Sequence, residues 1–140
     1  GQKAARLMTG GGHMVTISSL GSRMVLPAYT SVGVSKAALE AVTRYLAVEL
    51  AAKNIQVNAV SAGAVESEAL KLYTADPSLP KPAWQSTPAG RMVLPEDIAN
   101  LVAFLCSEES TMIRGQVIVI DGGITISPFT TGASAASPGK

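Results

Sequence analysis

The segment that most restricts the fold of this chain is IQVNAVSAG, residues 55–63. β-branched and small apolar residues occupy both of its alternating faces, which is typical of a strand buried inside a parallel sheet. Further strands are predicted at residues 14–18 and within residues 115–123. Between them, apolar residues recur at 3.6-residue spacing over residues 31–52 and 98–105, which indicates helices. Strands that alternate with helices predict an α/β fold with a doubly wound parallel sheet.

The composition of the chain is that of one globular domain with a substantial core. Its 140 residues are 47% hydrophobic and carry a formal net charge of +1. This charge favours neither nucleic acid nor an anionic membrane as a partner. No apolar run reaches the roughly 18 residues that span a bilayer. Because the first residues also lack the apolar core of a signal peptide, we expect a cytoplasmic protein.

The single cysteine and the single histidine do not indicate a metal or nucleophilic site. Cys106 lies in the apolar run LVAFLC, so we predict that it is a buried small hydrophobic residue. His13 has no partner at a metal-ligand spacing, and we predict that it is exposed at the start of the first strand. No metal is expected.

Tyr29 and Lys36 carry the clearest chemical signal in the chain. A phenol beside an ammonium group can donate a proton or a hydrogen bond to a developing oxyanion, because the positive charge favours the phenolate. Ser18 and Ser19 close the first strand shortly before Tyr29. Seven helical residues would span roughly 10 Å, too far for the two groups to meet. We therefore expect Tyr29, which follows Pro27, to lie in the loop before the helix.

The residues around this pair resemble the active-site segment of the short-chain dehydrogenase/reductase superfamily. The matching text is SSLGS, then Tyr29, then VGVSKAALEA and TRYLAVEL. Most members of the superfamily place the tyrosine four residues before the lysine, where this chain has Val32. The longer spacing found here is similar to the FabL-like, NADPH-dependent branch of the enoyl-acyl-carrier-protein reductases. The resemblance covers residues 10–126.

The resemblance implies a Rossmann-like fold of which this chain holds only the C-terminal portion. Residues 1–126 would form the C-terminal part of a single reductase domain, and residues 127–140, rich in Ser, Ala, Gly and Pro, would be a disordered tail. The glycine-rich phosphate turn of the superfamily comes earlier than the matched segments. In the superfamily, the residues that contact the adenosine ribose also come before the matched segments. The sequence therefore does not decide between NADPH and NADH.

The resemblance also implies roles for individual residues. Tyr29 would be catalytic by hydrogen bonding to the thioester enolate, and Lys36 by holding the cofactor ribose. Ser19, or failing it Ser18, would lie beside the same oxygen. The cofactor would be NADPH, with NADH as the alternative. Its binding residues would be Ser18, Tyr29, Lys36, Gly63, Ala64, Val65 and Ser67.

The function implied is NAD(P)H-dependent reduction of the 2,3 double bond of trans-2-enoyl-acyl-carrier-protein thioesters, a step of fatty acid biosynthesis. Two alternatives stay open. One is a 3-oxoacyl or other carbonyl reductase of the same superfamily. The other is an inactive truncated polypeptide that acts only in oligomerisation.

Residues 68–92 are predicted to form an irregular lid, because four prolines interrupt any long helix there. Its apolar side chains either roof an acyl chain or only pack the lid on the core: Leu70, Leu72, Tyr73, Leu79, Trp84 and Met92. An acidic carrier protein could meet the basic residues near its mouth, which are Lys71, Lys81 and Arg91.

The predicted helix at residues 31–52 has a broad apolar face that either packs in the core or, as in the resembling family, packs against a second copy in a homodimer or homotetramer. The charged residues expected mostly outside that face are Glu40, Arg44, Glu49 and Lys53. After the last strand, Asp121, Gly122 and Gly123 are expected to serve architecture and subunit packing.

Overall fold

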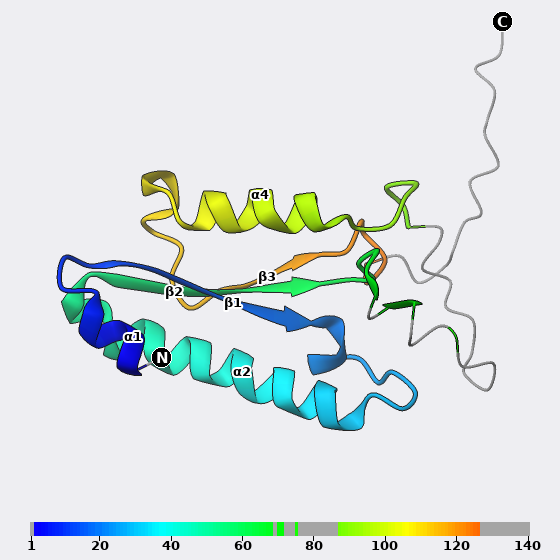
Figure 1. Cartoon of the computed structure of the whole chain (residues 1–140), viewed down its shortest axis with the longest axis horizontal. Helices are drawn as coiled ribbons and strands as arrows, with labels where there is room; N and C mark the ends of the chain where they lie inside the picture. The colour runs from blue at the N-terminus through cyan, green and yellow to red at the C-terminus, as the bar shows by residue number, and fades with distance from the viewer. Residues whose placement is uncertain (1, 69, 72–74, 76–86, 127–140) are drawn as a thin grey trace, which may run out of the picture.

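Three parallel strands form one sheet that lies between two layers of helices in the computed structural model (Figure 1). The structure describes residues 2–68, 70–71, 75 and 87–126. Helices α1 (Gln2–Leu7) and α2 (Thr30–Glu49) lie on one side of the sheet, and α4 (Pro95–Leu105) lies on the other. The predicted α/β class with a Rossmann-like parallel sheet is confirmed.

The strands are β1 (Gly12–Ser19), β2 (Ile55–Ala62) and β3 (Val117–Ile120), and β2 is the central one. All eight residues of β2 are buried, as its two-faced apolar pattern predicts. At the carboxyl ends, Ser19 pairs with Ala62, and Ala62 pairs with Ile120. The three strands therefore end along one edge, which is where open parallel sheets bind ligands.

One layer of the core lies between β2 and the helices α1 and α2. Ile55 and Val57 are fully buried and pack against Ala5 of α1 and Ala47 of α2. The two alanines let the helices approach the sheet closely. The partly buried residues around them are Met8, Met14, Leu46 and Leu50.

The sheet-facing side of α2 is small and polar over most of its length and apolar only near its C-terminal end, where Leu46, Ala47 and Leu50 pack on the core. Its buried residues are Gly33, Glu40, Thr43 and Ala47. They meet polar residues of β1, because Thr43 is hydrogen bonded to Thr16 at 2.9 Å and Ser18 donates to Glu40 at 2.7 Å. The polar face of the helix therefore packs inward.

The broad apolar face of α2 is correspondingly turned outward. Val34, Tyr45 and Val48 are 65%, 71% and 77% exposed. The alternative that this face packs in the core of the chain is wrong for these residues. Glu40, expected outside the apolar face, does lie outside it, but it is buried against β1.

Two other expectations are corrected. Cys106 is exposed, because it follows the fully buried Leu105 and one residue turns a helical side chain by about 100°. His13 is half-buried. It pairs in the ladder with the buried Gln56, and its Nδ1 atom is buried with no hydrogen-bond partner among the described residues.

Short 3-10 turns follow three of these elements. η1 (Leu20–Ser22) follows β1, η2 (Ala51–Lys53) follows α2, and η4 (Glu108–Ser110) follows α4. None of the helices within the described residues is long and apolar enough to cross a membrane. The predicted tail at residues 127–140 lies outside the described residues, and so do five residues of the predicted lid and its mouth: Leu72, Tyr73, Leu79, Lys81 and Trp84.

Candidate active site

A cavity of about 330 Å³ opens at the carboxyl ends of the strands, and we call it the strand-end cavity. All the predicted site residues line it: Ser18, Ser19, Tyr29, Lys36, Gly63, Ala64, Val65 and Ser67. The rest of its wall is apolar: Ile17, Leu20, Met24, Leu26, Ala62, Leu70, Ile98 and Ile124. One cavity thus combines a few polar groups with a mainly apolar lining, which is the usual composition of a small-molecule site.

Tyr29 lies at the N-cap position of α2, directly before the helix, as expected. Its carbonyl oxygen accepts the amide of Gly33 at 2.7 Å. Ala28 before it has a φ of 54°, a left-handed conformation that is uncommon for a residue with a side chain. This turn brings the Tyr29 hydroxyl to 3.4 Å from the Ser19 Oγ, to which it donates a hydrogen bond.

Lys36 lies two helical turns further on. Its Nζ atom donates to the backbone carbonyl oxygen of Ile17 at 2.9 Å. Ile17 and Ser19 are two residues apart on β1, a distance of roughly 7 Å along a strand. The phenol and the ammonium group therefore both reach the last three residues of β1, although seven positions separate them in the sequence.

The loop after β2 forms the opposite wall of the cavity. The Gly63 amide donates to the Ile120 carbonyl at 2.9 Å, and the Glu66 amide donates to the Val93 carbonyl at 3.0 Å. A Cβ atom at Gly63 would lie 2.9 Å from the Cα of Asp121, so only glycine fits there. These contacts hold the loop against the end of β3.

Asp121 directly follows β3 and fixes the turn after it. Burial by itself would raise the pKa of its carboxyl group, but hydrogen bonds from the Thr125 side chain and from the amides of Thr125 and Gly123 outweigh burial and lower it. Gly122 and Gly123 turn the chain with φ values of 66° and 88°. These contacts are of the architectural kind expected for residues 121–123.

Lys71 and Arg91, the two described basic groups near the mouth of the predicted lid, are paired with acids. Lys71 contacts Glu68 at 2.6 Å, and Arg91 binds both carboxylate oxygens of Asp97 at 2.5 and 2.8 Å. The Arg91 side chain and the Leu94 amide hold the pKa of Asp97 at about 2. Arg91 and Asp97 thereby fix the start of α4.

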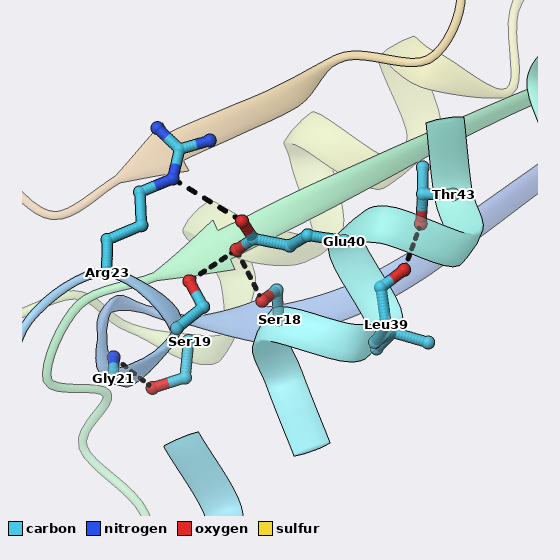
Figure 2. Close-up of polar contacts among 8 residues, drawn as sticks. Ser18, Ser19, Gly21, Arg23, Leu39, Glu40 and Thr43 are labelled. Carbon is cyan, nitrogen blue, oxygen red and sulfur yellow. Dashed lines mark hydrogen bonds and ion pairs between the residues drawn. The ribbon is translucent and has the colours of Figure 1, made fainter. Parts of the chain in front are cut away.

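Sequence reasoning missed a buried carboxylate beside the cavity. Glu40 is 4% exposed and accepts hydrogen bonds from Ser18 and Ser22, and Arg23 lies against it (Figure 2). Its position four residues after Lys36 could have indicated it, because residues four apart share one face of a helix.

Comparison with known proteins gives related reductases. A family model described as Enoyl-(Acyl carrier protein) reductase matches residues 1–125. The 1-cyclohexenylcarbonyl-CoA reductase of Streptomyces collinus is 37% identical over 139 residues, which cover 96% of this chain and 50% of that protein. The enoyl-acyl-carrier-protein reductase (NADH) FabI of Bacillus subtilis is 39% identical over 125 residues, covering 89% of this chain and 48% of that protein.

Among solved structures, FabI from Candidatus Liberibacter asiaticus matches with a TM-score of 0.78 and 32% identity, covering 93% of this chain and 50% of that one. The chain thus spans about half the length of the relatives it matches.

The contact between α2 and η1 yields a test of the site geometry. A Cβ atom at Gly33 would lie 2.6 Å from the carbonyl oxygen of Gly21. Gly33→Ala gains about 1 kcal/mol of helix propensity, but overpacking costs about 1–3 kcal/mol. We expect a net loss of about 1 kcal/mol in the free energy of unfolding, measured by denaturant titration. Ser31→Ala, at an exposed position of the same helix, should change it little. A Gly33→Ala protein more stable than the wild type would contradict the close contact.

Proposed function

Because the chain belongs to the enoyl-(acyl carrier protein) reductase family of short-chain dehydrogenases/reductases, we propose that the complete protein reduces the 2,3 double bond of trans-2-enoyl thioesters. The observation that carries this proposal is the convergence of the Tyr29 hydroxyl and the Lys36 ammonium group on one mainly apolar cavity. The acyl-carrier-protein form of the substrate and a role in fatty acid biosynthesis belong to the same proposal.

The lining of the cavity fits the reacting half of a nicotinamide dinucleotide. Lys36 offers a donor and the Tyr29 oxygen an acceptor to the ribose hydroxyls, and the main chain from Gly63 to Val65 offers hydrogen-bonding groups to a carboxamide. Ser67 offers a hydroxyl to the pyrophosphate. When bound, the nicotinamide supplies a hydride to the β-carbon of the enoyl thioester.

Tyr29 would act on the charge that this transfer creates. As the β-carbon gains the hydride, the electron pair of the double bond moves toward the thioester oxygen and leaves an enolate. The Tyr29 hydroxyl donates a hydrogen bond to that oxygen, and a proton is then added at the α-carbon to complete the saturated thioester. A preorganised donor at a developing oxyanion typically contributes about 10²- to 10³-fold in rate.

Lys36 and Ser19 would orient this donor. The Lys36 Nζ atom already donates to the main chain of β1, which holds its charge beside the cavity. In the structure the Ser19 Oγ accepts from the Tyr29 hydroxyl and from the Gly21 amide. When the phenol turns its single proton to the enolate oxygen, the Ser19 hydroxyl can donate to the phenol oxygen instead and so keep the ring in place. Ser18 lines the same cavity, but its hydroxyl donates to Glu40, which favours a supporting role.

The family uses nicotinamide cofactors, and we propose NADPH for this protein. The resemblance of residues 18–50 to the FabL-like branch favours it, whereas the Bacillus subtilis relative is named for NADH. A comparison of kcat/KM with the two reductants decides between them. A cytoplasmic location and a homodimer or homotetramer, which the exposed apolar face of α2 favours, stay predictions.

The reaction class is tested by the choice of substrate. We expect the complete protein to consume NADPH or NADH faster with a crotonyl thioester than with an acetoacetyl thioester, because the cavity would stabilise an enolate and not an alkoxide. The measurement is the rate of cofactor oxidation at equal substrate concentration. The opposite ranking would assign the protein to the 3-oxoacyl or carbonyl reductases of the superfamily.

Removal of the phenol hydroxyl should slow the reaction without removing the cofactor. We expect Tyr29→Phe to lower kcat for enoyl reduction by about 10²- to 10³-fold, while fluorescence titration still shows cofactor binding, because the Lys36 contact to the ribose would be kept. Tyr45→Phe is the matched control, because Tyr45 is on the same helix and 71% exposed. Unchanged turnover in Tyr29→Phe would reject the role of this phenol.

Removal of the amine should affect cofactor binding as well as rate. We expect Lys36→Ala to weaken cofactor affinity by about tenfold, the equivalent of roughly 1.4 kcal/mol, because its ammonium group would donate to the ribose. Lys53→Ala, at an exposed position of η2, should leave the affinity unchanged. Normal affinity in Lys36→Ala would argue against a ribose contact.

A further inference from the structure

Glu40 is a charged group buried beside the strand-end cavity without being part of its lining. It lies on the sheet-facing side of α2 and is 4% exposed. Its Oε1 accepts hydrogen bonds from the Ser18 Oγ at 2.7 Å and the Ser22 Oγ at 2.5 Å, and its Oε2 lies 3.4 Å from the Arg23 Nε. Figure 2 shows Ser18 and Arg23 directed at the two oxygens of this carboxylate from different sides.

The carboxyl group of Glu40 keeps its charge in this position. Burial by itself would raise its pKa, but the hydrogen bonds from Ser22 and Ser18, together with the Arg23 guanidinium, outweigh burial and hold the pKa below its usual value. A buried carboxylate is costly unless such donors surround it. The charge of Glu40 is therefore stabilised by Ser18, Ser22 and Arg23, and the positions of these three side chains are in turn fixed by Glu40.

These donors flank Ser19 along the chain. Ser18 precedes Ser19 directly, Ser22 ends the η1 turn that Ser19 caps, and Arg23 follows that turn. Ser19 in turn receives the hydrogen bond of the Tyr29 hydroxyl. Whatever holds Ser18 and Ser22 in place therefore also holds the oxygen against which the phenol is aligned.

Glu40 also belongs to the helix that carries the two candidate catalytic groups. It is four residues beyond Lys36, and residues four apart lie on one face of a helix. One carboxylate thus joins the helix of Tyr29 and Lys36 to the strand end and turn of Ser19.

We propose that Glu40 is a positioning residue of the active site, which sets the alignment of Tyr29 through Ser18, Ser22 and Ser19. The kinetic part of this proposal depends on the proposed enoyl reductase function. The geometric part does not, because it concerns only the contact between Tyr29 and Ser19.

The alternative is that Glu40 only anchors α2 to the sheet. The chain offers a matched control for that possibility, because Thr43 is fully buried on the same face of α2 and is hydrogen bonded to Thr16 of β1 at 2.9 Å. Thr43→Val removes this second tie between helix and strand. It should lower stability but leave the alignment of Tyr29 unchanged.

The kinetic test compares three variants of the complete protein. We expect Glu40→Ala to lower kcat by about 10- to 100-fold with little change in KM for the cofactor. Glu40→Gln should stay within about threefold of the wild type, because one amide oxygen can accept both serine hydroxyls. Thr43→Val should keep the wild-type kcat. An equal loss of kcat in Thr43→Val, or no loss in Glu40→Ala, would overturn the proposal.

A double-mutant cycle identifies the path of the effect. If Glu40 acts through the phenol, Glu40→Ala should add less than about twofold to the loss already caused by Tyr29→Phe, since coupled residues are not additive. Fully additive losses would overturn the assignment. Should Glu40→Ala not fold, Ser22→Ala replaces it in the cycle, because it removes one donor to Glu40 and leaves Ser18 in place.

A readout without substrate separates this proposal from the proposed function. In protein with ¹³C-labelled tyrosine, comparison with the Tyr29→Phe spectrum identifies the Tyr29 signal. We expect the chemical shift of the Tyr29 side chain to change in Glu40→Ala and to stay unchanged in Thr43→Val. A wild-type protein without enoyl reductase activity would reject the proposed function, and the tyrosine spectra would still decide the role of Glu40. Identical Tyr29 signals in wild type and Glu40→Ala would overturn it.

Discussion

The close contact between α2 and the turn after β1 determines where the candidate catalytic groups lie. Gly33 packs so near the Gly21 carbonyl that no Cβ atom fits between them. At this distance the Tyr29 phenol, directly before α2, reaches Ser19. The side chains further along α2 reach the residues of β1 that precede Ser19. The positions concerned follow one another at spacings of four and three residues, which is one face of a helix: 29, 33, 36, 40, 43 and 47.

Much of the fold could be predicted from the sequence, and the family resemblance indicated the eight site residues, but most of the apolar side chains that complete the cavity wall were not predicted. The two-faced apolar pattern of residues 55–63 specified a central parallel strand, and the carboxyl ends of parallel strands meet at one edge. The tyrosine and lysine were recognisable because the chemistry needs a phenol and a cation near each other. A proline before Tyr29 indicated the loop from which its ring reaches Ser19.

The orientation of α2 could not be predicted in the same way. Hydrophobic periodicity assumes that the apolar side of a helix faces the core, but the partner of α2 is a strand with Thr16 and Ser18 on the facing side. Only the match between these hydroxyl groups and the stripe of Glu40 and Thr43 reveals the inward face. Cys106 was misplaced for a related reason, since a six-residue apolar run at a helix end does not all turn inward.

The length of the relatives bears on why the valines and the tyrosine of α2 are exposed. The chain spans about half of each of them, and within the described residues β1 is paired along one edge only, by β2. Apolar surface and open strand edges of this kind attract other polypeptide segments. The outward face of α2 and the outer edges of β1 and β3, which is likewise paired only by β2 within the described residues, are therefore surfaces that further protein could cover.

The hydrogen bond from Lys36 to Ile17 has a consequence for mutational tolerance. The acceptor is a main-chain carbonyl, and the Ile17 side chain itself is 44% exposed. Substitution of residue 17 by another strand-forming residue leaves that oxygen in place. Lys36 is thus anchored to a main-chain oxygen that a point mutation at residue 17 does not remove. The side chains around the amine can therefore change while the position of its Nζ atom is kept.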